Sequence, residues 1–225
     1  AISFQIIDED IFEIGVHIAY VGYFVKEKSD IDKEAFERGN SVYLVDRVIP
    51  MLPEKLSNEL CSLRPNEDKL TFSVVFKLDI NGEIKNTWFG KTVIHSNQRF
   101  TYEQAQEIIK GKEHKFSIEI NTLNTIAKTL RRKRLNNGAL NIESSEVRFQ
   151  LNEEGFPVGT FIKVSKEAHQ LIEEFMLLAN KHVAIKMGKP QKNKMISPFI
   201  YRIHEDPNEE KLSDLKIYLQ AMGYE

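Results

Sequence analysis

The spacing of hydrophobic positions predicts strands in several parts of the chain. Apolar and polar residues alternate through much of residues 11–21, and a similar strand pattern begins at the first residue. Residues 69–96 contain two β-rich runs on either side of Asn81-Gly82, a pair suited to a tight hairpin turn with positive φ. A second hairpin is predicted at residues 147–164, and a single strand at residues 199–204.

Helical periodicity and end signals predict five helices among these strands. Thr101 is suited to cap the start of one helix, and Gly39, Gly138 and Gly188 to follow the ends of three others. Because hairpins are interleaved with helices rather than arranged as βαβ repeats, we expect an α+β fold with mixed and antiparallel sheet, hairpins and packed helices. The predicted helices cover residues 32–38, 102–110, 118–135, 166–187 and 208–222.

Residues 41–68 follow neither period. Pro50, Pro53 and Pro65 each remove a backbone donor, so neither a long helix nor a central strand can run through the segment. A loose linker would leave many apolar side chains in water, and we therefore expect a packed, shaped loop of the kind that often carries sites. The apolar residues are Tyr43, Leu44, Val48, Ile49, Met51, Leu52, Leu56, Leu60 and Leu63.

Composition narrows the class of protein only slightly. The chain has 225 residues, of which 41% are hydrophobic and 28% charged, so it can bury a real core. Its formal net charge of -2 carries no global basic excess, and any binding of a polyanion depends on local clusters. The single Cys61 excludes an intramolecular disulfide and favours a reducing, cytoplasmic location. We find no apolar run long enough for a membrane span, and no signal peptide.

Two basic clusters and six histidines are the first candidates for chemistry. The clusters at residues 128–134 and 186–194 either compensate helix ends or track phosphates, and composition leaves both interpretations open. The histidines have no metal-ligand spacing, and His17, on an apolar strand, is expected to be a hydrogen-bonded core residue. No HExxH, CxxC, GxSxG or glycine-rich phosphate loop occurs.

Glu173 and Glu174 are adjacent carboxylates inside an otherwise apolar predicted helix. Neighbouring helical residues point about 100° apart, so at least one carboxylate is expected on the packed or cleft side of the helix. A carboxylate there requires an arginine or lysine partner in the protein, or a hydroxyl donor on a ligand.

Five stretches of the chain carry a resemblance to a known family. They are GVHIAYVGYFV, RGNSVYLVDRVIPMLPEKLSNELCSLRPNEDKLTFS, RFTYEQA, LIEEFMLLAN and YRIHEDPNEEKL. They occur in the order found in the catalytic domain of ribonuclease R and ribonuclease II, the hydrolytic 3′-to-5′ exoribonucleases. The resemblance covers essentially all 225 residues, is closer to ribonuclease R, and implies the RNB catalytic fold.

The resemblance implies a narrow channel for single-stranded RNA, with a magnesium site at its floor and release of nucleoside 5′-monophosphates. Tyr43 matches the family tyrosine that packs on the 3′-terminal base, and Tyr102 matches a second tyrosine of the channel. The carboxylate pair matches a position that contacts the ribose hydroxyl, with Glu174 preferred and Glu173 open.

Other functional parts of the family are missing from these residues. In the family, the metal-binding Asp-x5-Asp-x-Asp-Asp cluster directly precedes a triplet like Ala1-Ile2-Ser3. Residues 1–225 do not contain this cluster, nor the SPIRRYPD motif, the cold-shock domains or the S1 domain of the family. We therefore expect residues 1–225 to be a partial RNB domain, truncated at both ends. We expect its metal-binding aspartates just before Ala1, and neither magnesium binding nor activity from the fragment alone.

Two departures from the family pattern leave the function open. Tyr20 and Gly22 stand where the family usually has Asp and Ser, and Ile142 stands where an aromatic often completes the base stack. The first hypothesis is part of an exoribonuclease, monomeric and without a membrane. The alternative is a nuclease-dead RNA-binding or scaffold module, and a third is a fragment that folds poorly and binds nothing.

Overall fold

The computed structural model describes residues 1–141, 146–189, 198–203 and 205–224. Ile142 and two lysines of the second basic cluster, Lys192 and Lys194, lie outside the described residues. The chain divides into two compact units, Ala1–Lys181 and His182–Glu225. None of the described helices combines the length and the apolar character needed to cross a membrane.

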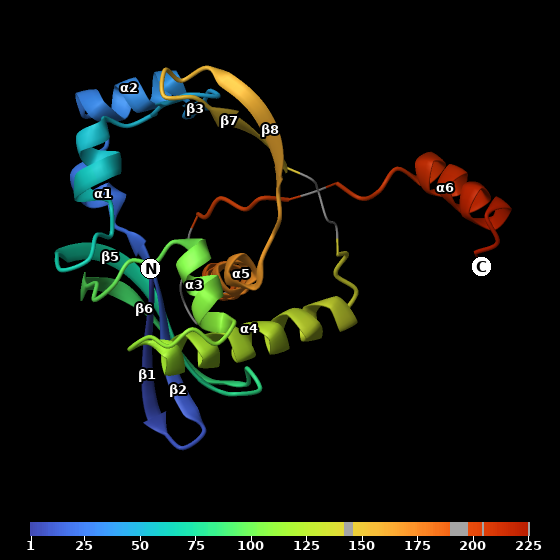
Figure 1. Cartoon of the computed structure of the whole chain (residues 1–225), viewed down its shortest axis with the longest axis horizontal. Coiled ribbons are helices and arrows are strands. Elements are labelled where there is room, and N and C mark those ends of the chain that lie inside the picture. Colours follow the sequence, from blue (N-terminus) through green and yellow to red (C-terminus); the bar gives the residue numbers. More distant parts are fainter. Residues whose placement is uncertain (142–145, 190–197, 204, 225) are drawn as a thin grey trace. The chain divides into compact units, whose positions relative to one another are not determined.

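The first unit is built around a four-stranded antiparallel sheet (Figure 1). Its strand order is β1-β2-β5-β6, and the hairpin predicted around Asn81-Gly82 is confirmed, with Gly82 at φ 73° in the turn. The Asp79 carboxylate tightens that turn by accepting hydrogen bonds from the backbone N–H groups of Asn81 and Glu83, at 3.0 and 2.9 Å. The strands are β1 (Ile2–Asp8), β2 (Ile11–Ala19), β5 (Asp68–Asp79) and β6 (Ile84–His95).

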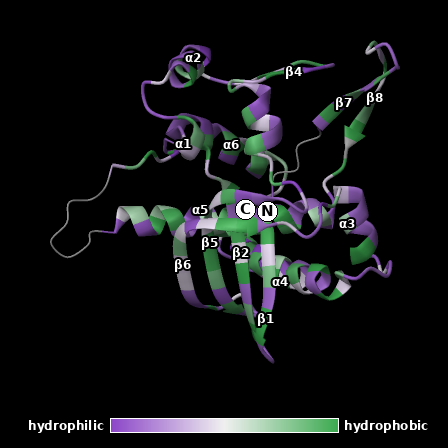
Figure 2. Ribbon diagram, turned by 90° about the vertical axis from the view of Figure 1, so that its left-hand side faces the viewer, coloured by the Kyte–Doolittle hydropathy of each residue, from purple (hydrophilic) through white to green (hydrophobic). Residues whose placement is uncertain are grey.

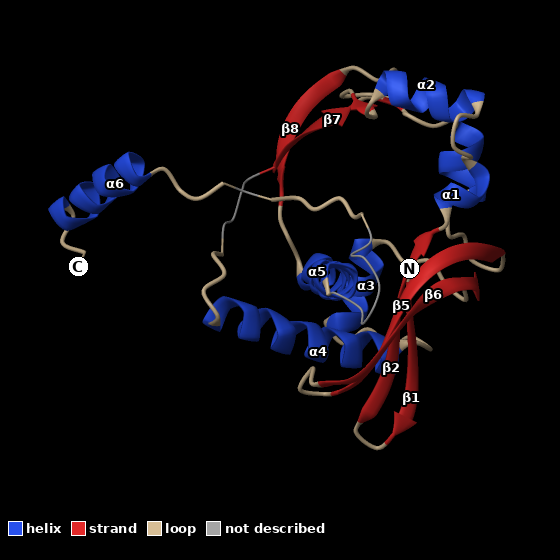
Figure 3. Cartoon of the chain, turned by 180° about the vertical axis from the view of Figure 1, so that it is seen from behind, coloured by secondary structure: helices blue, strands red, loops and turns tan. Residues whose placement is uncertain are grey.

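Three helices lie on one side of this sheet, as the opposite views of Figures 1 and 3 both show. They are α3 (Tyr102–Ile109), α4 (Ser117–Asn136) and α5 (Glu167–Gly188), so the helices predicted there are confirmed within a few residues. The alternating residues Phe12, Ile14 and Val16 of β2 and Val74, Phe76 and Leu78 of β5 are buried, which is the period-two pattern of a strand with an apolar face in a core. The core side chains include Phe12, Ile14, Val16, Val74, Phe76, Leu78, Leu123, Ile126, Leu171 and Phe175.

The start of α3 is fixed by a capping box. Thr101 accepts from the backbone N–H of Gln104 at 3.2 Å, and the Gln104 side chain accepts from the N–H of Thr101 at 2.9 Å. One turn further on, the buried Gln106 accepts a hydrogen bond from the N–H of Ala168 at 3.1 Å. This side chain therefore satisfies a free donor at the start of α5 and ties the two helices together.

The proline-punctuated segment contains no long helix and no central strand, as predicted. It forms the two-residue strands β3 (Val42–Tyr43) and β4 (Val48–Ile49), followed by a π-helix, η1 (Lys55–Leu60). The expected packing is wrong for its first half, because Tyr43 is 78% exposed and the apolar residues from 42 to 49 are exposed. Leu56 is the only fully buried residue of the described segment, and Met51, Leu52 and Leu63 in its second half are half-buried.

Two of the remaining predictions differ from the structure, and α1 (Val21–Phe24) was not predicted. Residues 198–203 form no strand, contrary to the strand predicted at 199–204, because no described strand pairs with them. Gly188 is the last residue of α5 rather than lying beyond it. The remaining elements are α2 (Asp30–Arg38), the hairpin β7 (Glu146–Leu151) and β8 (Pro157–Lys163), and α6 (Glu209–Ala221).

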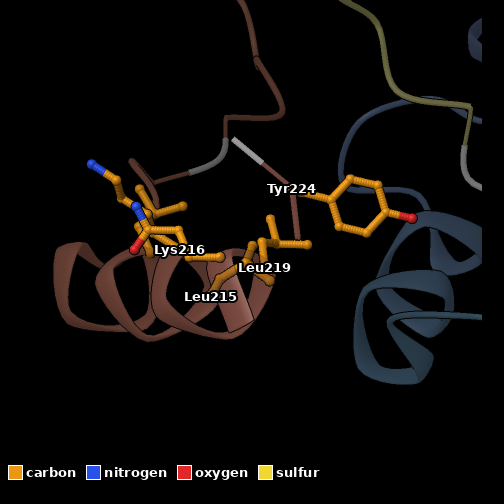
Figure 4. Close-up of a pocket in the computed structure, with 6 residues that line it drawn as sticks. Leu215, Lys216, Leu219 and Tyr224 are labelled. Atoms are coloured by element: carbon orange, nitrogen blue, oxygen red, sulfur yellow. The ribbon is translucent and has the colours of Figure 1, made fainter. Parts of the chain in front are cut away.

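In the second unit, α6 keeps an exposed apolar face. The Asn208 side chain caps the helix by accepting from the N–H of Lys211 at 3.0 Å. Figure 4 shows Leu215, Leu219 and Tyr224 around a shallow pocket, with Lys216 at its edge. The apolar face expected from the sequence is therefore present.

Candidate nucleic-acid interface

Glu174 lies on the α5 face that packs against α4, and it is only 3% exposed. Its carboxylate accepts two hydrogen bonds from the Arg134 guanidinium, 2.6 Å from Nη2 and 3.2 Å from Nε. This fork-to-carboxylate geometry is the strong form of an ion pair, and the carboxylate raises the pKa of Arg134 chiefly through its hydrogen bond. The buried carboxylate therefore has an arginine partner within the protein.

Glu173 is placed differently from its neighbour. Its side chain is 48% exposed and lies 3.4 Å from Arg134 Nη2 and 3.8 Å from Arg131 Nη1. Arg131 also approaches the Glu174 carboxylate, at 3.5 Å. The two acids and two arginines form a cluster, and Glu173 is the member of the acid pair that a ligand can reach. From the sequence, Arg131 and Arg134 were placed in the first basic cluster only. Their three-residue spacing is the signal that could have shown that both lie on one face of the helix.

Most cations of the basic cluster on α4 pair with acceptors of the protein itself. Lys128 pairs with Glu167 at 2.7 Å, and Lys133 pairs with Glu83. The Arg131 guanidinium also donates to the Asn141 side chain at 2.8 Å. Because these cations already hold protein acceptors and sit near a helix C-terminus, the structure favours the helix-compensating interpretation over a phosphate-tracking patch.

Tyr102 is the first residue of α3, and it stacks on His169 of α5. The two ring centroids are 4.0 Å apart with an interplanar angle of 14°, and Tyr102 is 45% exposed. One face of the tyrosine is thus covered by a ring of the protein, while much of its remaining surface stays open to solvent. His169 was not singled out from the sequence, because only the packing of α3 on α5 brings it to Tyr102.

Replacing Tyr102 with alanine is expected to lower the free energy of unfolding by about 0.5–1.5 kcal/mol, the usual contribution of a stacked aromatic pair. Tyr102→Phe keeps the ring and is the matched control, so it should unfold at the wild-type urea concentration. Equal destabilisation by both variants would contradict a contribution from stacking. Urea denaturation followed by circular dichroism measures the difference.

The four predicted site residues do not share a pocket among those found in the described part of the chain. Tyr43 lies on β3, opposite Val48, in the exposed half of the segment 41–68. One pocket belongs to α6, and a second is lined by residues around α3, including Phe100, Glu107 and His114. The structure thus brings Tyr102, Glu173 and Glu174 onto neighbouring helices of one layer and leaves Tyr43 on a separate element.

His17 is a hydrogen-bonded core residue, as predicted. Its Nδ1 lies 2.7 Å from Ser73 Oγ and its Nε2 lies 2.9 Å from Ser3 Oγ, so both ring nitrogens are engaged. Burial, followed by repulsion from the Ala1 ammonium, lowers the pKa of His17 from 6.5 to about 4. Thr92 continues the network by contacting Ser73 at 2.5 Å, so polar side chains run across all four strands.

The described residues contain no group of three or more histidine, cysteine or acidic side chains that could hold a metal ion. Magnesium prefers several carboxylates and waters around it. The donor set present does not fit that ion, and we derive no metal-dependent step from these residues.

The fold is similar to that of a solved RNase R structure. The structure of Mycoplasma genitalium RNase R in complex with ribose methylated single-stranded RNA superposes with a TM-score of 0.87 and 30% identity, covering 99% of this chain and 34% of that chain. The model of the RNB domain family matches residues 1–225. The chain belongs to the RNB domain family.

The chain is also similar in sequence to curated proteins, among them the following two. Ribonuclease R of Thermotoga maritima is 42% identical over 229 residues, covering 99% of this chain and 32% of the relative. "Inactive exonuclease DIS3L2" of Arabidopsis thaliana is 35% identical over 239 residues, covering 99% of this chain and 22% of the relative. The chain thus spans a third or less of the curated relatives it matches. The resemblance to ribonuclease R is confirmed, and the fold class with it.

Proposed function

We propose that this chain is the RNA-holding part of a hydrolytic 3′-to-5′ exoribonuclease that degrades single-stranded RNA to nucleoside 5′-monophosphates. The observation that carries the proposal is the match of the RNB domain family over all 225 residues. The similarity to an RNase R structure that contains single-stranded RNA supports the choice of ligand. We further propose that the protein acts in the cytoplasm, as a monomer and without a membrane.

In this proposal, exposed aromatic rings hold the bases. Tyr43, 78% exposed, stacks on the 3′-terminal base, and Tyr102 contacts a base with the part of its ring that His169 leaves open. Stacking tolerates any base because every base has a π face, so these contacts bind RNA without sequence preference.

The acid pair supplies the preference for RNA in this proposal. A carboxylate accepts a hydrogen bond from a ribose 2′-hydroxyl, a donor that DNA lacks. Glu174 is buried and already accepts two hydrogen bonds from Arg134, whereas Glu173 is half exposed. We therefore assign the contact with the 2′-hydroxyl to Glu173, although the sequence alone favoured Glu174 for it. Glu174 instead holds Arg134 in place.

Glu173→Gln tests this assignment. It is expected to weaken binding of a fluorescently labelled single-stranded oligoribonucleotide about tenfold, since a hydrogen bond to a charged group contributes roughly 1.5–3 kcal/mol. Binding of the oligodeoxynucleotide of the same sequence should stay unchanged. Fluorescence anisotropy gives both affinities, and Glu153→Gln, an exposed acid in the hairpin turn, is the matched control. A parallel loss for both nucleic acids would refute the hydroxyl contact.

Magnesium-dependent hydrolysis belongs, in this proposal, to the whole protein. The family pattern Asp-x5-Asp-x-Asp-Asp does not occur in the 225 residues, and the described residues offer no alternative ligand cluster. The chain alone is therefore expected to release no mononucleotides from a labelled oligoribonucleotide with magnesium present. Chromatographic detection of released mononucleotide would overturn this part.

The alternative is a nuclease-dead RNA-binding or scaffold module. The relative named as an inactive exonuclease, 35% identical over nearly the whole chain, favours keeping this candidate. The two functions predict the same RNA binding but different chemistry for the whole protein. Mononucleotide release by the whole protein with magnesium supports the exoribonuclease, and tight binding without release supports the dead module.

A further inference from the structure

One end of the sheet exposes the face that the core buries elsewhere. Phe12, Ile14 and Val16 of β2 are at most 8% exposed, yet Ile18, the next residue on the same face, is 50% exposed. Phe72, opposite Ile18 on β5, is 46% exposed. Lys91 of β6 lies opposite Phe72, so the register places Ile18, Phe72 and Lys91 side by side across three strands.

An aromatic cluster adjoins this uncovered end. It lies where β2 is followed by α1, and Figures 1 and 2 show the position of these two elements. Tyr20 is held to the sheet by a hydrogen bond from its N–H to Leu70 O at 3.0 Å. Its ring centroid lies 6.2 Å from that of Tyr23, which in turn makes an edge contact with Phe24 at 5.2 Å. Tyr23 is 51% exposed. The large ring at position 20, a departure from the family pattern, is thus accommodated at the surface.

Two lysines lie over the faces of these rings. Lys91 Nζ is 4.7 Å from the Tyr20 centroid, and Lys26 Nζ is 5.1 Å from the Tyr23 centroid. Among the described residues, neither ammonium has a carboxylate within 4.0 Å, unlike Lys85 and Lys112, which pair with acids. Hydrogen bonding to Lys91 also lowers the pKa of Tyr20, which fits a positive local field.

We propose that this surface, the tyrosine–lysine patch, is a second binding site for single-stranded nucleic acid, in addition to the site in the proposed function. It is formed by Ile18, Tyr20, Tyr23, Lys26, Phe72 and Lys91. A base stacks on the exposed aromatic surface while the two ammonium groups contact backbone phosphates. The inference rests on the proposed function, because that function supplies the nucleic acid.

The chemistry of the patch favours this ligand over other classes. An apolar partner gains nothing from two cations without carboxylate partners, and an acidic peptide gains little from the exposed aromatic surface. Alternating bases and phosphates match both features, because stacking uses the rings and charge neutralisation uses the lysines. The six residues of the patch include no carboxylate that could accept from a 2′-hydroxyl, so the patch should bind RNA and DNA strands equally.

The test measures binding of a labelled single-stranded oligonucleotide to the 225-residue chain at several salt concentrations. Tyr23→Ala is expected to weaken binding about fivefold or more by removing a stacking surface, without changing the salt dependence. Lys91→Gln is expected to lower the slope of log affinity against log salt by about 0.7, the value for one lost phosphate contact on a single strand. Tyr23→Phe should retain affinity because it keeps the ring.

Matched controls separate the patch from general surface effects. Phe156→Ala removes an exposed aromatic ring elsewhere, and Lys112→Gln removes an exposed lysine that is paired with Glu107. Both are expected to bind as the wild type does. Tyr23→Ala and Lys91→Gln should affect RNA and DNA equally, in contrast to Glu173→Gln.

The outcomes distinguish this inference from the proposed function. If the wild-type chain binds RNA and Tyr23→Ala and Lys91→Gln match it in affinity and salt slope, the patch is overturned while the proposed function stands. If the wild-type chain binds no single-stranded nucleic acid, both are overturned. Thermal melting of each variant shows that a loss of affinity does not come from a loss of folding.

Discussion

Replacing Arg134 with methionine is expected to lower the free energy of unfolding by about 3–5 kcal/mol, the usual cost of leaving a buried charge without its partner. Glu174 is 3% exposed and takes both its short contacts from Arg134. The remaining cation, Arg131, is 3.5 Å away and offers no comparable fork. Urea denaturation measures the loss.

Two further variants make this expectation specific. The double variant Arg134→Met with Glu174→Met removes both charges, and it should recover most of the lost stability because no carboxylate stays buried alone. Arg148→Met breaks an exposed ion pair with Glu146 and should cost less than about 1 kcal/mol. If Arg134→Met behaved like Arg148→Met, the cluster would not stabilise the packing of α4 on α5.

The second large effect is a loss of stability in mild acid that depends on His17. In the folded protein the pKa of His17 is about 4, while the ordinary value of 6.5 applies to the unfolded chain. Between these values the unfolded chain binds a proton that the folded protein does not. The contribution of His17 to the free energy of unfolding is therefore complete above pH 6.5 and decreases as the pH falls toward 4. It amounts to up to about 3 kcal/mol.

Denaturation of the wild type and of His17→Gln at a series of pH values tests this effect. The variant has no imidazole to protonate, so its stability should decline less between neutral pH and about pH 4.5. It should also be less stable than the wild type at neutral pH, because Ser3 and Ser73 lose a well-placed partner. Parallel pH curves for the two proteins would rule out His17 as the source of acid sensitivity.

The local features of the site were accessible from sequence to different degrees. Tyr43, Tyr102, Glu173 and Glu174 came from matched motifs, and their roles toward RNA stay predictions. The sequence could not predict the partner of Glu174, because an arginine and a ligand hydroxyl can each donate a hydrogen bond to a buried carboxylate. The structure supplied Arg134, and with it the reason to assign the ligand contact to Glu173.

The sequence by itself determined the elements whose signals are local. The Asn81-Gly82 turn, the Thr101 cap and the end of α2 at Gly39 were all predicted, because a turn or a cap depends on residues only a few positions apart. The resemblance to ribonuclease R rested on ordered motifs in the same way, and it was confirmed.

Only the tertiary structure decided which distant residues meet and which surfaces stay open. It left the apolar residues of 42–49 exposed, paired residues 199–203 with none of the described strands, and joined Arg134 to Glu174 across forty positions of the chain. Strand pairing, burial and buried ion pairs all require a second element at a suitable distance, and no pattern within one element specifies that partner. Long-range packing therefore decided the surfaces, the ion pairs and the arrangement of the candidate site.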